Sequence, residues 1–256
     1  MTRKEFLALL AAGSASRALA ETTPAPDAKS PPAAAPKAAP ASLRLPAVQP
    51  GKPYLQVGPL LGHLGTNQAH LWIRSTAPVP WKVRISESAA LEGAREIAGP
   101  LPEEATGCTA TAIIDGLQPG TRYFYEVLVE DRPQTFSPLP SFVTAPLPGT
   151  SGRQRIAFGS CVGETQIFAA PAWAELAERR ELGPQGGGFD LLLMLGDNHY
   201  ANTTEIAKLR THYTAHRLTA GWRDLSARTP IYAIWDDHDF GPDNSDGTLK
   251  GKENSL

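Results

Sequence analysis

Three short apolar runs, each followed at once by polar side chains, constrain the fold of this chain most strongly. The runs span 156–158, 189–195 and 230–235. Helix-favouring stretches at 172–181 and 204–227 separate them, the second interrupted near Gly221. Strands that alternate with helices form parallel sheets, and continuous hydrophobicity is typical of strands buried on both faces. The region 153–256 is therefore predicted to be an α/β layer built on parallel strands.

The preceding region, 51–147, has a different pattern. Between 54 and 144, short segments alternate apolar and polar residues, and Gly and Pro clusters separate them, as in an all-β sandwich. The segment 116–127 resembles the turn and strand of a fibronectin type III domain, in which Tyr123 hydrogen-bonds back across the corner. The expected fold class is mixed: a fibronectin type III-like β-sandwich followed by an α/β layer.

The N-terminus has the composition of a targeting segment. Residues 1–20 combine a basic start (Arg3 and Lys4), an apolar middle and a small-residue ending, which is the pattern of an export signal peptide. The start resembles the twin-arginine (Tat) motif with Lys4 in place of the second arginine; ordinary Sec secretion and an N-terminal helix of the mature fold stay open. Residues 21–50 are rich in Ala and Pro and are predicted to be an extended linker. The expected location is periplasmic or extracellular.

The overall composition argues against several classes of protein. The 256 residues carry 24 basic and 26 acidic side chains, which gives no sign of nucleic-acid-specific binding. No apolar run approaches the roughly 20 residues of a transmembrane helix. The two cysteines, Cys108 and Cys161, fall in different predicted domains, so no disulfide is expected between them.

Metal-ligand types of side chain follow each of the three apolar runs: Cys161; then Asp197, Asn198, His199 and Tyr200; then Asp236, Asp237, His238 and Asp239. The carboxyl ends of parallel strands meet at one edge of a sheet, where α/β proteins bind ligands. Two carboxylates about 5 Å apart repel by roughly 3 kcal/mol at an effective dielectric near 20, and a hard metal ion relieves that repulsion. The pattern therefore predicts a metal site, with a solvated acidic loop as the alternative.

The same segments resemble a known family. The sequences at 159–161, 196–200 and 235–240 are similar to motifs of the PhoD-type alkaline phosphatases and phosphodiesterases, within the metallophosphoesterase superfamily. Those enzymes also place an export signal and a β-sandwich ahead of an αββα catalytic layer. The resemblance implies metal-dependent hydrolysis of small-molecule phosphate esters, with Fe(3+) and Ca(2+) as cofactors and Zn or Mn as alternatives.

The resemblance assigns metal-ligand positions to five residues: Cys161, Asp197, Tyr200, Asp237 and Asn244. Among these, Asp197 corresponds to the carboxylate that bridges the ions, Cys161 and Tyr200 to ligands of Fe(3+), and Asn244 to a ligand of Ca(2+). His238 corresponds to the catalytic histidine that contacts the substrate phosphate or the leaving oxygen. Supporting roles, such as helix capping or hydrogen bonds to ligands, are expected of Asp236, Asp239 and Asn198.

In this family the catalytic layer continues beyond the position that matches Leu256, with further strands and another histidine-bearing segment. The chain is therefore expected to be a truncated part of such an enzyme, with little hydrolysis of p-nitrophenyl phosphate on its own. His212 and His216, four residues apart in a predicted helix, are expected to be surface or packing residues. The alternative function is a non-catalytic exported module, in which the β-sandwich contacts a surface polymer and the acidic edge binds calcium.

Overall fold

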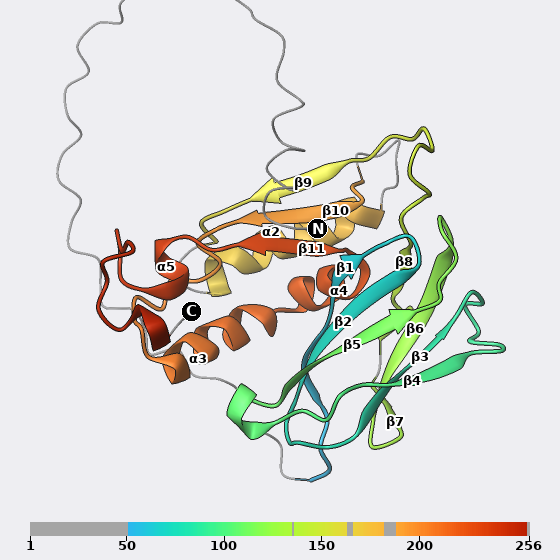
Figure 1. Ribbon diagram of the computed structural model, residues 1–256, viewed down its shortest axis with the longest axis horizontal. Coiled ribbons are helices and arrows are strands. Elements are labelled where there is room, and N and C mark those ends of the chain that lie inside the picture. The colour runs from blue at the N-terminus through green and yellow to red at the C-terminus, as the bar shows by residue number, and fades with distance from the viewer. Residues whose placement is uncertain (1–50, 135, 163–165, 182–187, 255–256) are drawn as a thin grey trace, which may run out of the picture. The chain divides into compact units, whose positions relative to one another are not determined.

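The computed structural model describes residues 51–134, 136–162, 166–181 and 188–254; the predicted signal peptide and linker lie outside them. All the described residues belong to one compact unit of the chain, Pro40–Leu256. Figure 1 shows antiparallel sheets formed by the first eight strands and, after residues 144–155, which contain no helix or strand, a parallel sheet with its helices.

The first eight strands form two antiparallel sheets. One has the order β1-β2-β5, in which β1 is Leu55–Leu64, β2 is Gln68–Ser75 and β5 is Thr109–Asp115. The other has the order β4-β3-β6-β7, with β8 paired to β6. Its strands are β3 (Trp81–Ser86), β4 (Arg95–Ala98), β6 (Arg122–Val129), β7 (Arg132–Gln134) and β8 (Ser141–Val143), and the 3-10 helix η1 (Glu104–Thr106) precedes β5.

The two antiparallel sheets share one apolar core, because alternate residues of their strands point inward. β2 contributes Leu71 and Ile73 and β6 contributes Tyr125, all fully buried. The hydroxyl of Tyr123 accepts a hydrogen bond from the Gln118 N–H at 2.9 Å. The predicted contact of this tyrosine across its corner is therefore confirmed.

The remaining strands form a parallel sheet of order β11-β10-β9, as the three apolar runs predict. Its strands are β9 (Ile156–Gly159), β10 (Leu191–Leu195) and β11 (Ile231–Ile234). Helix α2 (Gln166–Glu181) connects β9 to β10, and α3 (Ile206–Arg217) and α4 (Ala220–Arg228) connect β10 to β11. The chain continues through the single turn α5 (Asp237–Phe240) and the 3-10 helix η2 (Lys252–Asn254).

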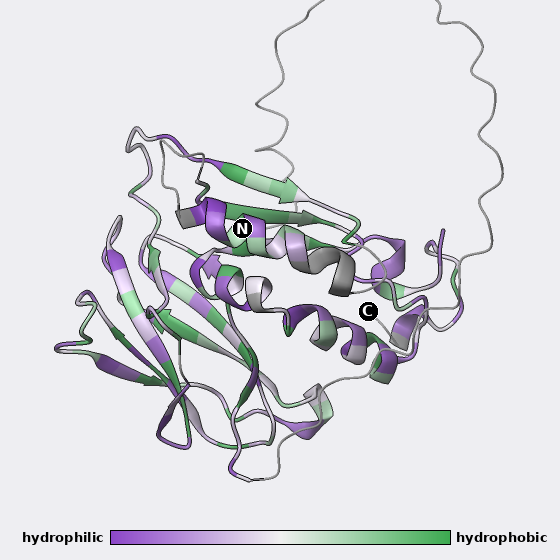
Figure 2. Ribbon diagram, turned by 180° about the vertical axis from the view of Figure 1, so that it is seen from behind, coloured by the Kyte–Doolittle hydropathy of each residue, from purple (hydrophilic) through white to green (hydrophobic). Residues whose placement is uncertain are grey.

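The two faces of the parallel sheet differ in their cover. Figure 2 shows apolar strands behind α2 and α4, and the packed face joins Leu192 and Met194 to Trp173 and Trp222 of these helices. On the other face Phe158 is 72% exposed, although it belongs to a continuous apolar run. Among the described residues, the parallel strands are therefore buried on the face that α2 and α4 cover. The prediction that both faces are buried holds for that face alone.

Contacts between the sandwich and the α/β layer fix α4 in place. The fully buried Tyr125 hydroxyl donates to the Ala227 carbonyl at 2.6 Å. Gly221 lets α4 approach α2, because a Cβ at this position would lie 2.4 Å from the Ala174 nitrogen. None of the described helices has the length and apolar character of a membrane span.

Candidate metal centre

The loops that follow the three parallel strands meet at one edge of the sheet. The Cys161 N–H, beyond β9, donates to the Gly196 carbonyl at 3.3 Å, and the Val162 N–H donates to the Asp197 carbonyl at 3.2 Å. Gly196 has φ +104, and a Cβ there would lie 2.7 Å from the Asp236 Cβ beyond β11. Only glycine allows this approach of the β10 loop to the β11 loop without strain.

Several residues around this edge have left-handed backbones although they are not glycine. Asp197 has φ 52, Cys161 has φ 57 and Asn202 has φ 52. Such conformations cost free energy and persist where surrounding contacts impose them, and they cluster at functional sites. The side chains of these residues contact the same cluster: Cys161 donates to Asp197, and Asn202 lies against His238.

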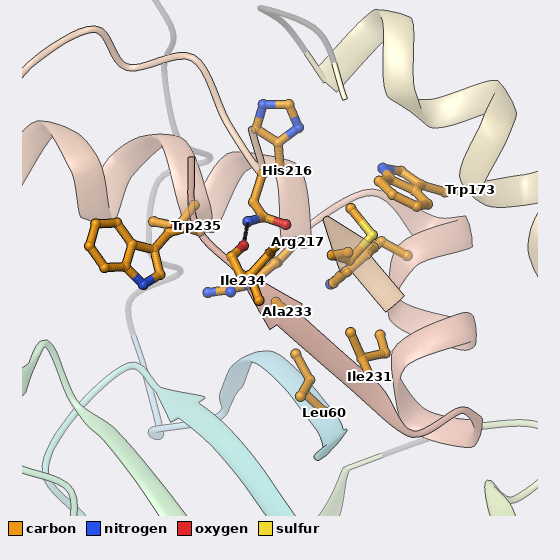
Figure 3. Close-up of a pocket in the computed structure, with 12 residues that line it drawn as sticks. Leu60, Trp173, His216, Arg217, Ile231, Ala233, Ile234 and Trp235 are labelled. Atoms are coloured by element: carbon orange, nitrogen blue, oxygen red, sulfur yellow. Dashed lines mark hydrogen bonds between the residues drawn. The ribbon is translucent and has the colours of Figure 1, made fainter. Parts of the chain in front are cut away.

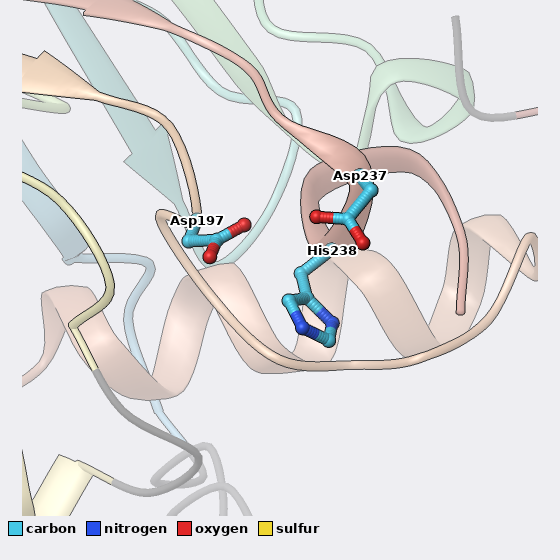
Figure 4. Close-up of side chains that lie close together, drawn as sticks. All are labelled: Asp197, Asp237 and His238. Atoms are coloured by element: carbon cyan, nitrogen blue, oxygen red, sulfur yellow. The ribbon is translucent and has the colours of Figure 1, made fainter. Parts of the chain in front are cut away.

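Asp197, Asp237 and His238 form the centre of the site. One ligand atom from each lies within 4.8 Å of the others. Figure 4 shows the carboxylates of Asp197 and Asp237 facing each other, with the imidazole of His238 beside them. Asp197 comes from the loop after β10, and the other two from the first turn of α5. Residues 40 positions apart are thus brought to one cluster.

The two carboxylate oxygens of Asp197 differ in their partners. Its Oδ2 accepts hydrogen bonds from the Tyr200 hydroxyl at 3.0 Å and from the Cys161 thiol at 3.4 Å. Its Oδ1 is buried and has no hydrogen-bond partner among the described residues. A buried carboxylate oxygen without a partner is costly, so this atom is suited to binding a cation.

Tyr200 bonds to Asp197 as a neutral phenol. Burial, then its hydrogen bonds with Cys161 and Asp197, raise the pKa of the Tyr200 hydroxyl above its ordinary value. Its ring lies 4.2 Å from that of His238, measured between centroids. Asp197 therefore contacts Cys161 and Tyr200, and the ring of Tyr200 lies against that of His238.

His238 is held on both sides of its ring. Its Nδ1 lies 2.7 Å from Asn202 Oδ1, and its Nε2 lies 3.4 Å from Asp243 Oδ1. A neutral ring that donates Nδ1–H to Asn202 would present an Nε2 lone pair to this carboxylate. The arrangement therefore suits either an imidazolium or a cation next to Nε2. The sequence motifs did not point to Asn202, because the residue that orients His238 lies 36 positions earlier in the chain.

Asp239 is the buried support of the site. Its Oδ1 accepts from the Asn198 N–H at 2.9 Å and the Tyr213 hydroxyl at 3.0 Å. Its Oδ2 accepts from the Asp236 N–H at 2.9 Å and from the Asn198 side-chain amide at 3.2 Å. Asp236 in turn caps α5 by accepting from the Asp237 N–H at 2.9 Å. Asp239 therefore joins the loops after β10 and β11 through hydrogen bonds.

Asn244 lies beside the centre through its backbone. Its N–H donates to Asp237 Oδ2, and its side-chain amide donates to Asp243 Oδ2 at 2.9 Å. The side chain is exposed, and φ at this residue is 61. The predicted role of Asn244 as a calcium ligand therefore stays a prediction.

A cavity of about 410 Å³ lies next to Asn198, between β11 and α3. Figure 3 shows Trp173, Trp235 and other apolar side chains around it, together with His216. His216 is 6% exposed, and neither of its ring nitrogens has a hydrogen-bond partner among the described residues. Burial, then the nearby His212, lowers the pKa of His216 to about 4. His216 is thus a neutral packing residue beside the site.

His199 is also buried and neutral. It is 0% exposed, and its Nδ1 accepts from the Ala201 N–H at 3.0 Å. Because Nδ1 is an acceptor, the neutral ring carries its proton on Nε2 and offers no lone pair to a metal. Burial, then the charges of His212 and His216, lowers the pKa of His199 to about 3. His199 therefore packs beneath the loop and is not a ligand.

The charges of the centre fit a metal ion. Two carboxylates within 4.8 Å repel by about 3 kcal/mol at an effective dielectric near 20. The donors are carboxylate, imidazole, thiol and phenol, a set that accommodates Fe, Zn or Mn, and carboxylate and amide oxygens also suit Ca. Cys108 and Cys161 are both free, as predicted, which leaves the Cys161 sulfur available at the centre.

Comparison with known proteins gives matches of two kinds. A family described as "Domain of unknown function (DUF7800)" matches residues 52–146. No curated protein matches the chain. The solved structure of PhoD aligns with 73% of this chain at 20% sequence identity and a TM-score of 0.61. That of the purple acid phosphatase PPD1 from yellow lupin (Lupinus luteus) seeds aligns with 81% at 15% identity and a TM-score of 0.57.

The alignments cover a part of each phosphatase. They take in 40% of the PhoD chain and 39% of the lupin chain, so this chain spans about two fifths of the length of the structures that it matches. At these identities the likeness is one of fold. The chain therefore shares the fold of one part of two phosphatases, and its acidic centre lies at the edge of the parallel sheet within that fold.

Proposed function

We propose that the strand-end centre binds metal ions and hydrolyses phosphate esters. The observation that carries this proposal is the convergence of Asp197, Asp237 and His238 within 4.8 Å, with one buried Asp197 oxygen lacking a partner among the described residues. The shared fold with PhoD and a purple acid phosphatase supports it. The proposed substrates are small-molecule phosphate monoesters or diesters. Export to the periplasm or exterior through residues 1–20 belongs to the same proposal.

The proposed ligands divide into two groups. Asp197 is the bridging carboxylate, and Cys161 and Tyr200, both hydrogen-bonded to its Oδ2, complete the side that suits Fe(3+). Because burial and its neighbours raise the pKa of Tyr200, binding through the phenolate requires a strongly charged ion. Asp237 and Asn244 are the proposed Ca(2+) side, and Zn or Mn are the alternative ions.

His238 is the proposed general acid. When bound, the metal ions offset the charge of the phosphate oxygens and lower the pKa of an attacking water. In its imidazolium form His238 donates Nδ1–H to Asn202 and has Nε2–H available for the leaving oxygen. The carboxylate of Asp243 lies 3.4 Å from Nε2. Asp239 keeps the loops of Asp197 and His238 in register through its four hydrogen bonds.

The test measures metal content and hydrolysis together in the product of the full-length gene, isolated from its native host. Metal analysis and turnover of p-nitrophenyl phosphate and its bis ester are expected to fall in parallel on Asp197→Asn, because this change removes a charged ligand. Asp131→Asn is the matched control, since the Asp131 side chain is 82% exposed in the sandwich. A protein free of Fe, Ca, Zn and Mn, or an Asp197→Asn variant as active as the control, would refute the proposal.

The alternative function gives a different result in the same experiment. A calcium-binding module without catalysis would contain Ca but show no metal-dependent turnover before or after substitution. Loss of thermal stability on removal of Ca, without any activity to lose, would favour that module. Saturable, metal-dependent turnover is therefore the deciding measurement.

A further inference from the structure

Three arginine side chains gather in a hollow between the sandwich and α3. Arg74 comes from β2, and Arg210 and Arg217 come from α3; all three line a cavity of about 110 Å³. The cavity is also bordered by three threonines, Thr106, Thr109 and Thr214. In Figure 1 this is the region where α3 passes η1. A cavity of this size holds several water molecules, or one small oxyanion in their place.

One carboxylate, that of Asp239, partly offsets the positive charge of this hollow by acting on Arg217. Among the described residues, none of the ion pairs involves Arg74, Arg210 or Arg217, whereas Lys82, Arg84 and Arg228 each pair with an acidic side chain. Burial, followed by the charge of Arg210, lowers the pKa of Arg74. Burial, with a smaller contribution from Arg74, lowers the pKa of Arg217, whereas Tyr213 and Asp239 act in the opposite direction. Arg74 thus repels both Arg210, which is exposed, and Arg217.

The known contacts of the arginines leave donors available. Arg74 donates through Nη1 to Thr214, but its Nε is buried and has no partner. Arg210 donates to the Ala105 carbonyl through Nη2 at 2.9 Å. Arg217 stacks its guanidinium over the rings of Trp72 and Tyr213, at 5.4 and 4.7 Å from their centroids. Stacking fixes the plane of this group while its N–H edges remain available.

We propose that this hollow is a binding site for a tetrahedral oxyanion, either free inorganic phosphate or the phosphate group of a monoester. Guanidinium groups bind phosphate through paired, charge-assisted hydrogen bonds. The hydroxyls of Thr106, Thr109 and Thr214 already donate to backbone carbonyls, so the arginines are the donors of this hollow. The bound anion offsets the mutual repulsion of the arginines and holds α3 against β2. This proposal does not depend on metal binding or hydrolysis at the acidic centre.

The test is calorimetric titration of the full chain with sodium phosphate, in buffer with EDTA so that metal-bound phosphate does not contribute. Saturable binding is expected, with a rise in the unfolding temperature that sodium chloride at equal ionic strength does not reproduce. Arg210→Gln is expected to weaken phosphate affinity by about tenfold or more, because one charge-assisted contact is lost. Lys208→Gln is the matched control: Lys208 lies on the same helix and pairs with Glu205 outside the hollow.

A second arm uses glycerol 2-phosphate to distinguish the two sources of the oxyanion. Tighter binding of inorganic phosphate assigns the site to the free ion, and equal or tighter binding of the ester assigns it to a phosphorylated molecule; either result supports the site. Absence of saturable binding of both ligands overturns the proposal. Equal losses of affinity in Arg210→Gln and Lys208→Gln also overturn it, since they indicate attraction by net charge alone. Because EDTA removes the metals, this failure is distinct from failure of the proposed hydrolysis.

Discussion

Asp239→Asn tests whether one buried carboxylate holds the two strand-end loops together. Asp239 is 5% exposed and accepts four hydrogen bonds, two at each oxygen. In the asparagine variant the amide nitrogen replaces one acceptor. Its less costly orientation is toward Tyr213, whose hydroxyl can reverse and accept, so that the Asn198 N–H alone loses its acceptor. The remaining bonds lose the charge that strengthens them.

The expected cost follows from these contacts. One buried donor left without an acceptor costs about 1–3 kcal/mol, and the weakened bonds add to it, so the free energy of unfolding should fall by about 2–4 kcal/mol. Urea denaturation followed by circular dichroism, on metal-free protein, measures this change. The exposed Asp131→Asn substitution is expected to change stability by no more than about 0.5 kcal/mol. If Asp239→Asn changes the unfolding free energy as little as Asp131→Asn, Asp239 does not join the loops.

Two further perturbations address the surroundings of the centre. The pKa of His216 in the fold is about 4 against an ordinary 6.5, so its contribution to stability is intact above pH 6.5 and is lost as the pH falls toward 4. His216→Phe should reduce the loss of unfolding free energy between pH 7.5 and pH 5 by about 2 kcal/mol, and an unchanged loss would contradict this. Gly196→Ala should destabilise by about 1–3 kcal/mol more than Gly120→Ala, judged by thermal unfolding. Both glycines have positive φ, but only at Gly196 does a Cβ meet another residue, and equal effects would disprove the clash.

Local sequence patterns predicted the strands and the order of the site segments. Continuous apolar runs predicted the three parallel strands. This was possible because the residues that favour a strand and the polar residues that follow its end lie within a few positions of one another. The turn sequence predicted the hydrogen bond of Tyr123 for the same reason. The placement of Asp236 at the start of α5 also follows from local capping preferences.

Contacts between distant segments could not be predicted from these patterns. Asn202 reaches His238 across 36 positions, and Tyr213 reaches Asp239 across 26. The spacing of His212 and His216 indicated one helix face but not which neighbours that face meets. The arginine hollow requires β2 of the sandwich to lie against α3. Arg74 is 136 positions from Arg210 and farther from Arg217, and no motif in either segment indicates that they pack together.

Tyr213 lies between Asp239 and the guanidinium of Arg217. Its hydroxyl donates to Asp239 on the side of the centre, and its ring carries the guanidinium of Arg217 on the side of the hollow. Burial, followed by the charge of Asp239, raises the pKa of this hydroxyl, so that Tyr213 stays a neutral spacer. Arg217 and Asp239 attract each other across the ring. On the side of the centre Asp197 and Asp237 repel each other, and on the side of the hollow Arg74 and Arg210 repel each other. Under the two proposals each cluster binds a counter-ion of its own, a cation at the sheet edge and an oxyanion against α3.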